Sequence, residues 1–283
     1  MTFALQERRS TTELRRQARS YLALKKIRVP RSWGVTTLGK CTTGWYGFYM
    51  LGEKETVHIS WCHGGQVDAS FAFSLMDIIR MFPTHVGSYN AIQGIGLLSK
   101  SRNVGVKYFL DNTDDDWMFM VDSDQYITPG AFAKLINAAD KDKVPFVSGL
   151  YFAAYWPTPN ELEPVPLIYV NRGEAGVLPY YDYPKDSLVE VYAAGTGCML
   201  IHRSVLEKLR ELGAEVSGKD WAWFQDGPIE AGKWLSEDLL FCDRVQRAGI
   251  KIHAHTGAVM PHHKSMWVTE SHYDDWLKKQ DLT

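Results

Sequence analysis

An unbroken apolar run that ends in two carboxylates constrains the fold of this chain more than any other stretch. The run is WMFMVD, residues 117–122, and the segment DSD places Asp122 and Asp124 one residue apart at its far end. A short run without polar alternation is typical of a strand covered on both faces. Directly after it, Thr128 and Pro129 have the pattern of a helix N-cap and a first helical residue. A buried strand followed by a helix predicts an α/β fold.

Strand and helix signals alternate along much of the chain. Strands are predicted at 56–61, 117–122, 144–153 and 250–257, helices at 68–82, 128–142 and 236–249, a glycine-interrupted helical stretch at 91–112, and a glycine-broken strand followed by a helix over 191–209. The proline-rich residues 154–187 are predicted to form a long loop region or lobe rather than a helix. Strands that alternate with helices predict a mixed, mainly parallel sheet flanked by helices. In such sheets, ligands bind beyond the carboxyl ends of the strands.

The acidic pair has two interpretations. Mg²⁺ and Mn²⁺ are typically held by one or two carboxylates together with waters and substrate phosphates, and Asp122 and Asp124 supply the carboxylates. The alternative is structural, with Asp122 capping a turn and Asp124 exposed to solvent. The position of the pair at the end of a buried strand leaves both interpretations open.

Further motifs accompany the acidic pair in a definite order. Arg102 and Asn103 precede it by about twenty residues, and GTGC (195–198), SED (236–238) and PHH (261–263) follow it. Over about residues 56–265, these motifs resemble those of the GT-A fold nucleotide-sugar glycosyltransferases, above all the bacterial and phage enzymes related to glycosyltransferase family 2. The resemblance implies a Rossmann-like GT-A fold. It also implies metal-dependent transfer of a sugar from a nucleotide diphosphate, with UDP as the nucleotide and Mn²⁺ or Mg²⁺ as cofactor.

The resemblance assigns a role to each matching residue. The metal site would consist of Asp122 and Asp124 with His262 or His263, the doubled histidine leaving the register open. Nucleotide and donor binding would fall to Ser60, Trp61, His63, Gln66, Arg102, Asn103, Asp122, Ser123, Asp124, Gly195, Thr196 and Gly197. Asp238 and Glu237 would be catalytic, with Asp238 as base if transfer inverts and Glu237 holding hydroxyl groups of the donor or acceptor. Alternatively, both acidic residues only favour the start of a helix.

The resemblance divides residues 56–265 into two halves and says nothing about the 55 residues before them. The predicted parts are a basic helix and loop extension (1–55), a nucleotide-sugar half (56–153), an acceptor half (154–265) and a tail (266–283). The acceptor half contains aromatic residues that are candidates either for acceptor contacts or for core packing: Trp156, Tyr180, Tyr181, Trp221, Trp223 and Phe224. Aromatic rings suit sugar rings or an extended protein segment. Because no membrane-anchor pattern is found, we expect a protein or soluble glycan acceptor rather than a lipid-linked one.

Charge and composition limit the partners. A net charge of −2 argues against a general nucleic-acid binder. Residues 1–31 nevertheless hold nine Arg or Lys and two Glu, and Ser10 with Glu13 forms a capping-box pattern. This predicted helix is either a solvated docking helix or an arm for an acidic partner or a membrane surface. No apolar run long enough to span a bilayer and no signal-peptide pattern is found, so the expected location is cytoplasmic, or the host cytoplasm if phage-encoded.

Two other function classes compete with the glycosyltransferase hypothesis. A phosphohydrolase or nucleotidyltransferase also uses an Asp-x-Asp metal site, although Tyr126 stands where an aspartyl phosphatase would need Thr or Val. A non-catalytic carbohydrate-binding module would retain the fold without the chemistry.

Overall fold

The computed structural model describes residues 55–94, 96–158, 161–212, 222–228 and 234–265, together with Glu270 and Tyr273. These residues belong to the second of the two units into which the chain divides, Gly47–Thr283. The predicted basic helix in residues 1–31 and the candidate Trp221 lie outside the described residues. Within the described part of the chain, no helix is both long and apolar enough to cross a bilayer.

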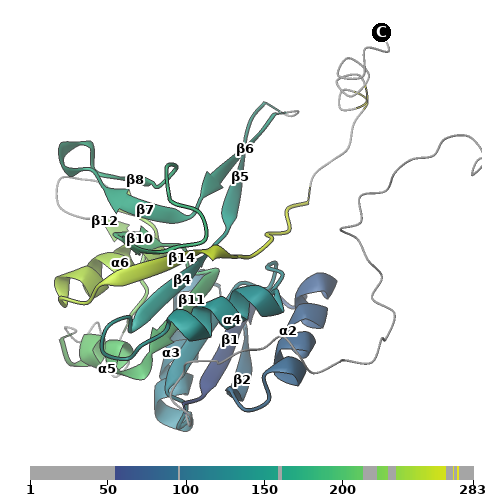
Figure 1. Ribbon diagram of the computed structural model, residues 1–283, viewed down its shortest axis with the longest axis vertical. Helices are drawn as coiled ribbons and strands as arrows, with labels where there is room; N and C mark the ends of the chain where they lie inside the picture. Colours follow the sequence, from purple (N-terminus) through teal and green to yellow (C-terminus); the bar gives the residue numbers. More distant parts are fainter. Residues whose placement is uncertain are drawn as a thin grey trace, which may run out of the picture. The chain divides into compact units, whose positions relative to one another are not determined.

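A seven-stranded sheet forms the centre of the described unit (Figure 1). In spatial order its strands are β2 (Val86–Gln93), β1 (Val57–His63), β3 (Trp117–Val121), β11 (Cys198–His202), β4 (Phe146–Leu150), β14 (Ile252–Val259) and β9 (Leu188–Val191). Strands β2, β1, β3, β4 and β14 run in one direction, whereas β11 and β9 run against them. The prediction of an α/β fold with a mixed, mainly parallel sheet is confirmed.

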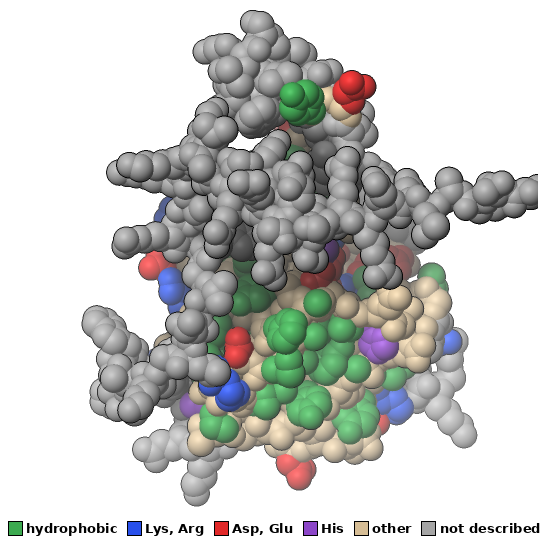
Figure 2. Space-filling model, turned by 90° about the vertical axis from the view of Figure 1, so that its right-hand side faces the viewer, with side chains coloured by type: hydrophobic (Ala, Val, Ile, Leu, Met, Phe, Trp, Pro, Cys, Tyr) green, Lys and Arg blue, Asp and Glu red, His purple; other side chains and the backbone are tan. Residues whose placement is uncertain are grey.

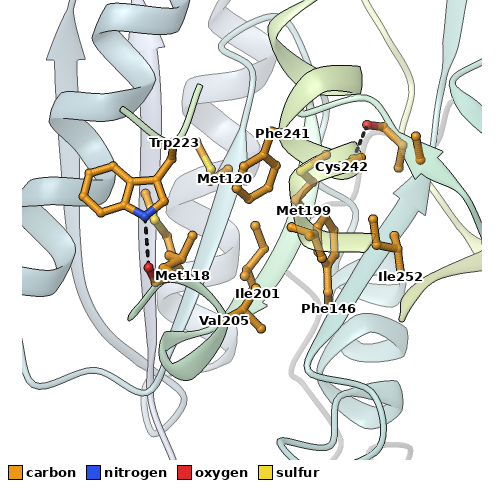
Figure 3. Close-up of a cluster of buried hydrophobic side chains, with 14 of the residues drawn as sticks. Met118, Met120, Phe146, Met199, Ile201, Val205, Trp223, Phe241, Cys242 and Ile252 are labelled. Carbon is orange, nitrogen blue, oxygen red and sulfur yellow. Dashed lines mark hydrogen bonds between the residues drawn. The ribbon is translucent and has the colours of Figure 1, made fainter. Parts of the chain in front are cut away.

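Helices cover both faces of this sheet. Their bounds are α2 (Ala69–Met81), α3 (Leu98–Asn112), α4 (Pro129–Ala138), α5 (Arg203–Leu212) and α6 (Glu237–Arg247). Side chains of α2 and α4 form one buried cluster with the sheet, and side chains of α3, α5 and α6 form the other. Figure 3 shows the second cluster, where residues from β3, β11, α5 and α6 meet.

Strand β3 shows why the opening apolar run lacks alternation. All five of its residues are buried. Trp117, Phe119 and Val121 belong to the cluster beneath α2 and α4, whereas Met118 and Met120 belong to the opposite cluster. The strand is therefore covered on both faces, as its sequence predicts.

The predicted helix boundaries are set by local capping contacts. The Asp68 carboxylate accepts a hydrogen bond from the Ser70 backbone N–H at 2.7 Å and begins α2. The Thr128 hydroxyl accepts from the Ala131 N–H at 3.1 Å, with Pro129 as the first residue of α4. Gly249 follows α6 with a φ of 75°, a conformation that glycine adopts without strain. The start of α4 confirms the cap predicted at Thr128 and Pro129, and Asp68 and Gly249 stand at the predicted limits of the other two helices.

The structure differs from two secondary-structure predictions. Residues 154–187, predicted as loop, contribute to a ribbon of β5 (Phe152–Thr158) with β6 (Glu161–Pro166) and to a small sheet of β10 (Ala193–Ala194), β7 (Ile168–Asn171) and β8 (Val177–Pro179), with a short 3₁₀ helix, η1, at Gly173–Ala175. Proline is tolerated there because a two-stranded ribbon uses the N–H groups of only one edge of each strand. Residues 91–93, assigned to a helical stretch, instead end the edge strand β2. The remaining pair of strands is β12 (Gly227–Pro228) with β13 (Trp234–Leu235).

Helix α2 buries one stripe and exposes another. Phe71, Leu75 and Ile78 pack in the core, whereas Phe73 and Met76 are 66% and 55% exposed. Figure 2 shows hydrophobic side chains gathered on the face of the molecule that carries α2. Exposed apolar surface of this kind is typical of contact regions.

Candidate active site

The loop after β3 is fixed in place by three backbone hydrogen bonds to two other segments. The Asp122 N–H donates to the Gly197 carbonyl at 3.3 Å, just before β11. The Tyr126 N–H donates to the Pro261 carbonyl at 2.9 Å, and the His263 N–H donates to the Asp124 carbonyl at 2.8 Å. These bonds bring the segment after β14 against the acidic loop.

A cavity of about 400 Å³ opens at this edge of the sheet. It is lined by Cys62, Leu98, Arg102, Asp122, Ser123, Asp124, Tyr151, Leu167, Thr196, Glu237, Asp238, His262 and Lys264. The carboxyl ends of the parallel strands β1, β3, β4 and β14 all lead into it, and the antiparallel β11 begins there. The cavity therefore lies where parallel α/β sheets generally bind ligands.

A buried arginine joins two of the carboxylates. Arg102 Nη2 lies 3.0 Å from Asp122 Oδ1, and Nη1 donates to Glu237. The side chain of Arg102 is only 5% exposed. Burial by itself lowers the pKa of Arg102, but Asp122 and Glu237 together outweigh that effect and raise it. Burial raises the pKa of the Glu237 carboxyl, and Arg102 opposes the shift. Arg102 thus holds the acidic loop and the start of α6 together.

Removing this arginine should destabilise the fold. In Arg102→Met, Asp122 and Glu237 lose a shared, desolvated cation, and we expect the free energy of unfolding to fall by about 2–4 kcal/mol. Urea denaturation measures this change. The matched control is Arg80→Met, whose side chain is 73% exposed and pairs with Asp77 one turn away. That control should change the unfolding free energy by less than about 0.5 kcal/mol. Equally small decreases of the unfolding free energy in both variants would show that Arg102 does not hold the acidic loop and α6 together.

Asp124 faces two basic side chains instead. Its Oδ2 lies 2.8 Å from Lys264 Nζ and 3.2 Å from His262 Nε2. Burial raises the pKa of the Asp124 carboxyl, but its contacts with His262 and Lys264 outweigh burial and lower this pKa to about 2. At neutral pH, Asp124 is therefore an ionised carboxylate that points into the cavity.

The orientation of His262 suits a cation. Its Nδ1 lies 2.8 Å from the Phe152 carbonyl oxygen, which only accepts hydrogen bonds, so Nδ1 must be the donor. With Nδ1 as donor, Nε2 carries a proton when it donates to Asp124 Oδ2, whereas the neutral ring would present its Nε2 lone pair to a cation bound by that carboxylate. Metal-binding histidines are commonly oriented by such an Nδ1–H to carbonyl bond. Two acceptors that converge in this way fit a divalent cation placed between them.

The other two predicted metal ligands have different partners. Asp122 is bound by Arg102. His263 Nδ1 contacts the carboxylate of Asp68 at the start of α2. Within the described residues, no group of three or more His, Cys, Asp or Glu side chains gathers closely enough to hold a metal by itself. Asp124 and His262 would supply two ligands to a bound Mg²⁺ or Mn²⁺, and phosphate and water oxygens would supply the others.

The acidic start of α6 reaches the same cavity. Asp238 Oδ1 accepts from the Leu239 N–H at 2.8 Å and from the Ser236 hydroxyl. The carboxylate is thus oriented by its own helix terminus while it lines the cavity. Glu237 is held by Arg102, so the two neighbouring acidic residues have distinct environments. The proposed roles of both residues in catalysis stay predictions.

The small-residue turn before β11 is shaped by Tyr151. The Gly197 N–H donates to the Tyr151 hydroxyl at 2.8 Å, and a Cβ at Gly195 would lie 2.2 Å from the same oxygen. Only glycine therefore fits at Gly195 without displacing Tyr151. Burial raises the pKa of the Tyr151 hydroxyl well above its ordinary value, and Asp122 adds to the shift. Thr196, between the glycines, lines the cavity.

Several residues predicted to bind nucleotide do not line this cavity. Ser60 is buried beneath Gly105 of α3. The ring of Trp61 stacks on Tyr89 at 6.4 Å. Among the others, His63 accepts from the Gly65 N–H, Gln66 is exposed, and Asn103 exchanges two hydrogen bonds of 2.8 Å with the Phe224 backbone. Their contacts with a nucleotide stay predictions.

Two aromatic acceptor candidates are core residues. Trp223 and Phe224 are each 1% exposed. The Trp223 indole N–H donates to the Leu206 carbonyl at 3.0 Å, as Figure 3 shows, and Phe224 stacks on Phe241 with centroids 4.4 Å apart. Their role in acceptor binding is therefore excluded by burial. Trp156 and Tyr180 are half-buried, and Tyr181 is 65% exposed.

Sequence reasoning missed two polar residues of the cavity. Lys264 directly follows the doubled histidine, and Tyr151 interrupts the apolar run that begins at β4. Lys264 thus adjoins the PHH motif, and Tyr151 lies within the strand predicted at 144–153. Neither carries a spacing that identifies its partner, because the contacts of Lys264 with Asp124 and of Tyr151 with Gly197 are long-range.

Comparisons with known proteins give remote structural likenesses. No protein-family model matches the chain, and no curated protein sequence matches it significantly. A crystal structure of A197 from STIV is 17% identical and has a TM-score of 0.45, with 74% of this chain and 86% of that chain covered. A crystal structure of GalNAc-T7 with UDP, GalNAc and Mn²⁺ is 11% identical and has a TM-score of 0.48. It covers 75% of this chain, which spans only 43% of GalNAc-T7. At identities this low, a functional conclusion must come from the chemistry of the cavity itself.

Proposed function

We propose that the protein is a glycosyltransferase that moves a sugar from a nucleotide diphosphate, with UDP as the expected nucleotide, to a protein or soluble glycan hydroxyl. The main support for the proposal is that five acidic or basic residues of the sequence motifs line one cavity. Arg102, Asp122 and Asp124 meet Glu237 and His262 there, although they come from four separate parts of the chain. Sequence motifs suggested each residue, and the cavity supplies the geometry that one site needs.

The chemistry of sugar transfer matches these groups. Departure of a nucleoside diphosphate develops negative charge, and positive charge develops at the anomeric carbon. A divalent cation held by Asp124 and His262 would neutralise charge on the diphosphate as a Lewis acid. Arg102 keeps Asp122 and Glu237 in fixed positions at the cavity wall, where hydroxyl groups of the donor or acceptor need acceptors.

Asp238 is the proposed general base for an inverting transfer. Its carboxylate lines the cavity, and the Leu239 N–H and Ser236 hydroxyl orient it. It would accept the proton of the acceptor hydroxyl as that oxygen attacks the anomeric carbon. The acceptor would approach from the half that carries the exposed rings of Tyr155 and Tyr181. In that half, flat side chains offer contact area at modest entropic cost.

A donor panel tests the proposal. The metal-free protein is incubated with nucleotide sugars, with and without Mn²⁺, and release of nucleoside diphosphate is measured with and without added glycans or peptides. We expect release that requires Mn²⁺, with one donor preferred. Phosphate release from simple phosphate esters would instead favour a phosphohydrolase. Glycan binding without turnover of any donor would favour a non-catalytic module. Either result would contradict the glycosyltransferase proposal.

A further inference from the structure

Lys264 stands out because it shares one carboxylate oxygen with His262. Its Nζ lies 2.8 Å from Asp124 Oδ2, the oxygen that also faces His262 Nε2. The Lys264 side chain is 38% exposed and lines the cavity. An ammonium group therefore supplies positive charge at the carboxylate where the proposed function places a divalent cation.

The Lys264 ammonium and a metal ion would compete for this oxygen of Asp124. A divalent cation bound by Asp124 would lie within a few ångströms of the ammonium, and like charges at such distances repel even in a partly hydrated site. Lysine has a flexible stem and three donors but no acceptor. It can therefore leave Asp124 and find another anion, whereas His262 is fixed by its bond to the Phe152 carbonyl.

The surrounding backbone allows this exchange without movement of the loop. The segment before Lys264 is held by the hydrogen bonds from Tyr126 to Pro261 and from His263 to Asp124. The His263 side chain adds a contact with Asp68. Because these contacts fix residues 261–263, only the Lys264 side chain needs to move. An ion pair this exposed is weak, so its release costs little.

We propose that Lys264 is a built-in counter-ion of Asp124 that gives way to the divalent cation and then binds the diphosphate of the donor. This inference rests on the proposed function. It predicts that the cation and the nucleotide bind cooperatively. The cation must displace Lys264, and a diphosphate offers the displaced ammonium a new partner. By linkage, each ligand raises the affinity for the other by the same factor.

Calorimetry on the full chain separates the two roles of Lys264. For Lys264→Met, we expect Mn²⁺ alone to bind about three- to tenfold more tightly than to the wild type, because the competitor is gone. UDP in saturating Mn²⁺ should bind about tenfold or more weakly, because a charge-assisted bond to phosphate is lost. These opposite shifts are not expected from a merely structural lysine. Lys264→Gln should behave in the same way, and thermal melting checks that both variants are folded.

The matched control is Lys251→Met. Lys251 pairs with Glu190 at 2.7 Å in an exposed ion pair at the opposite end of β14. This variant should leave the affinities for Mn²⁺ and for UDP unchanged. Unchanged or weaker Mn²⁺ binding in Lys264→Met would overturn the counter-ion role, and unchanged UDP binding would overturn the diphosphate role.

Failure of the inference is distinguishable from failure of the proposed function. If Asp124→Asn abolishes metal-dependent UDP binding while Lys264→Met changes neither affinity, the inference fails and the proposed function stands. If the wild type binds UDP equally well without Mn²⁺ and Lys264→Met abolishes that binding, both the counter-ion role and the metal site are wrong. If UDP binds under no condition, the proposed function fails together with the inference.

Discussion

Asp124→Asn should lower the affinity for UDP in the presence of Mn²⁺ by at least about a hundredfold. The substitution keeps the shape of the side chain but removes the ionised carboxylate that faces His262 Nε2 and the Lys264 ammonium. Loss of groups that merely orient metal ligands already costs tenfold to a hundredfold, so loss of a ligand should cost more. Calorimetric titration with UDP at saturating Mn²⁺ measures the change.

A second carboxylate provides the control for this substitution. Asp111 is also held by two cations, with Lys107 Nζ at 3.1 Å and Arg210 Nη2 at 2.8 Å, but it lies outside the cavity. Asp111→Asn should leave UDP affinity within about twofold of the wild type. A folded Asp124→Asn variant with unchanged affinity would show that this carboxylate is not part of the nucleotide site.

Asp238→Asn should reduce the turnover number by about 10²–10⁴ if the transfer inverts. The amide preserves the shape of the side chain and can still accept a hydrogen bond from the Leu239 N–H, but it cannot take a proton from the acceptor. Because Asp238 makes no ion pair with Arg102, UDP affinity should change by less than about threefold. Steady-state transfer rates and calorimetry together measure these two quantities.

A carboxylate on the same helix controls for changes in α6. Asp243 contacts the Tyr192 hydroxyl at 2.7 Å and Arg247 Nε at 2.7 Å, and it does not line the cavity. Asp243→Asn should retain turnover within about threefold. If Asp238→Asn also retains turnover, Asp238 only stabilises the helix start, which is the alternative role considered from the sequence.

The sequence predicts those parts of the fold whose signals are local. The apolar run of β3 and the caps at Asp68 and Thr128 lie within a few residues of the structures they determine. The β5–β6 ribbon was missed because its strands contain proline, which is tolerated in a two-stranded ribbon by pairing that no local pattern records. Edge strand β2 was missed because glycine and polar residues interrupt its alternation.

In the candidate site, too, the sequence predicts local features but not the contacts between distant residues. Motif order indicated which residues would meet, but not which pairs would form. The contact between Arg102 and Glu237 joins residues 135 positions apart, and that between Asp124 and Lys264 spans 140 positions. The choice between His262 and His263 depends on the backbone after β14, which directs His262 toward the cavity and His263 toward Asp68. Tertiary contacts therefore determine which of the two histidines lines the cavity.

A crystal structure with UDP and Mn²⁺ would test the proposed metal and nucleotide site most directly. Anomalous scattering locates manganese independently of the protein atoms. We predict one manganese about 2.1 Å from both Asp124 Oδ2 and His262 Nε2, bridged to the diphosphate of UDP, with the Lys264 ammonium moved from Asp124 onto a phosphate oxygen. Manganese bound elsewhere, or UDP bound in the cavity with Lys264 still on Asp124 and no metal beside it, would contradict this arrangement of the site.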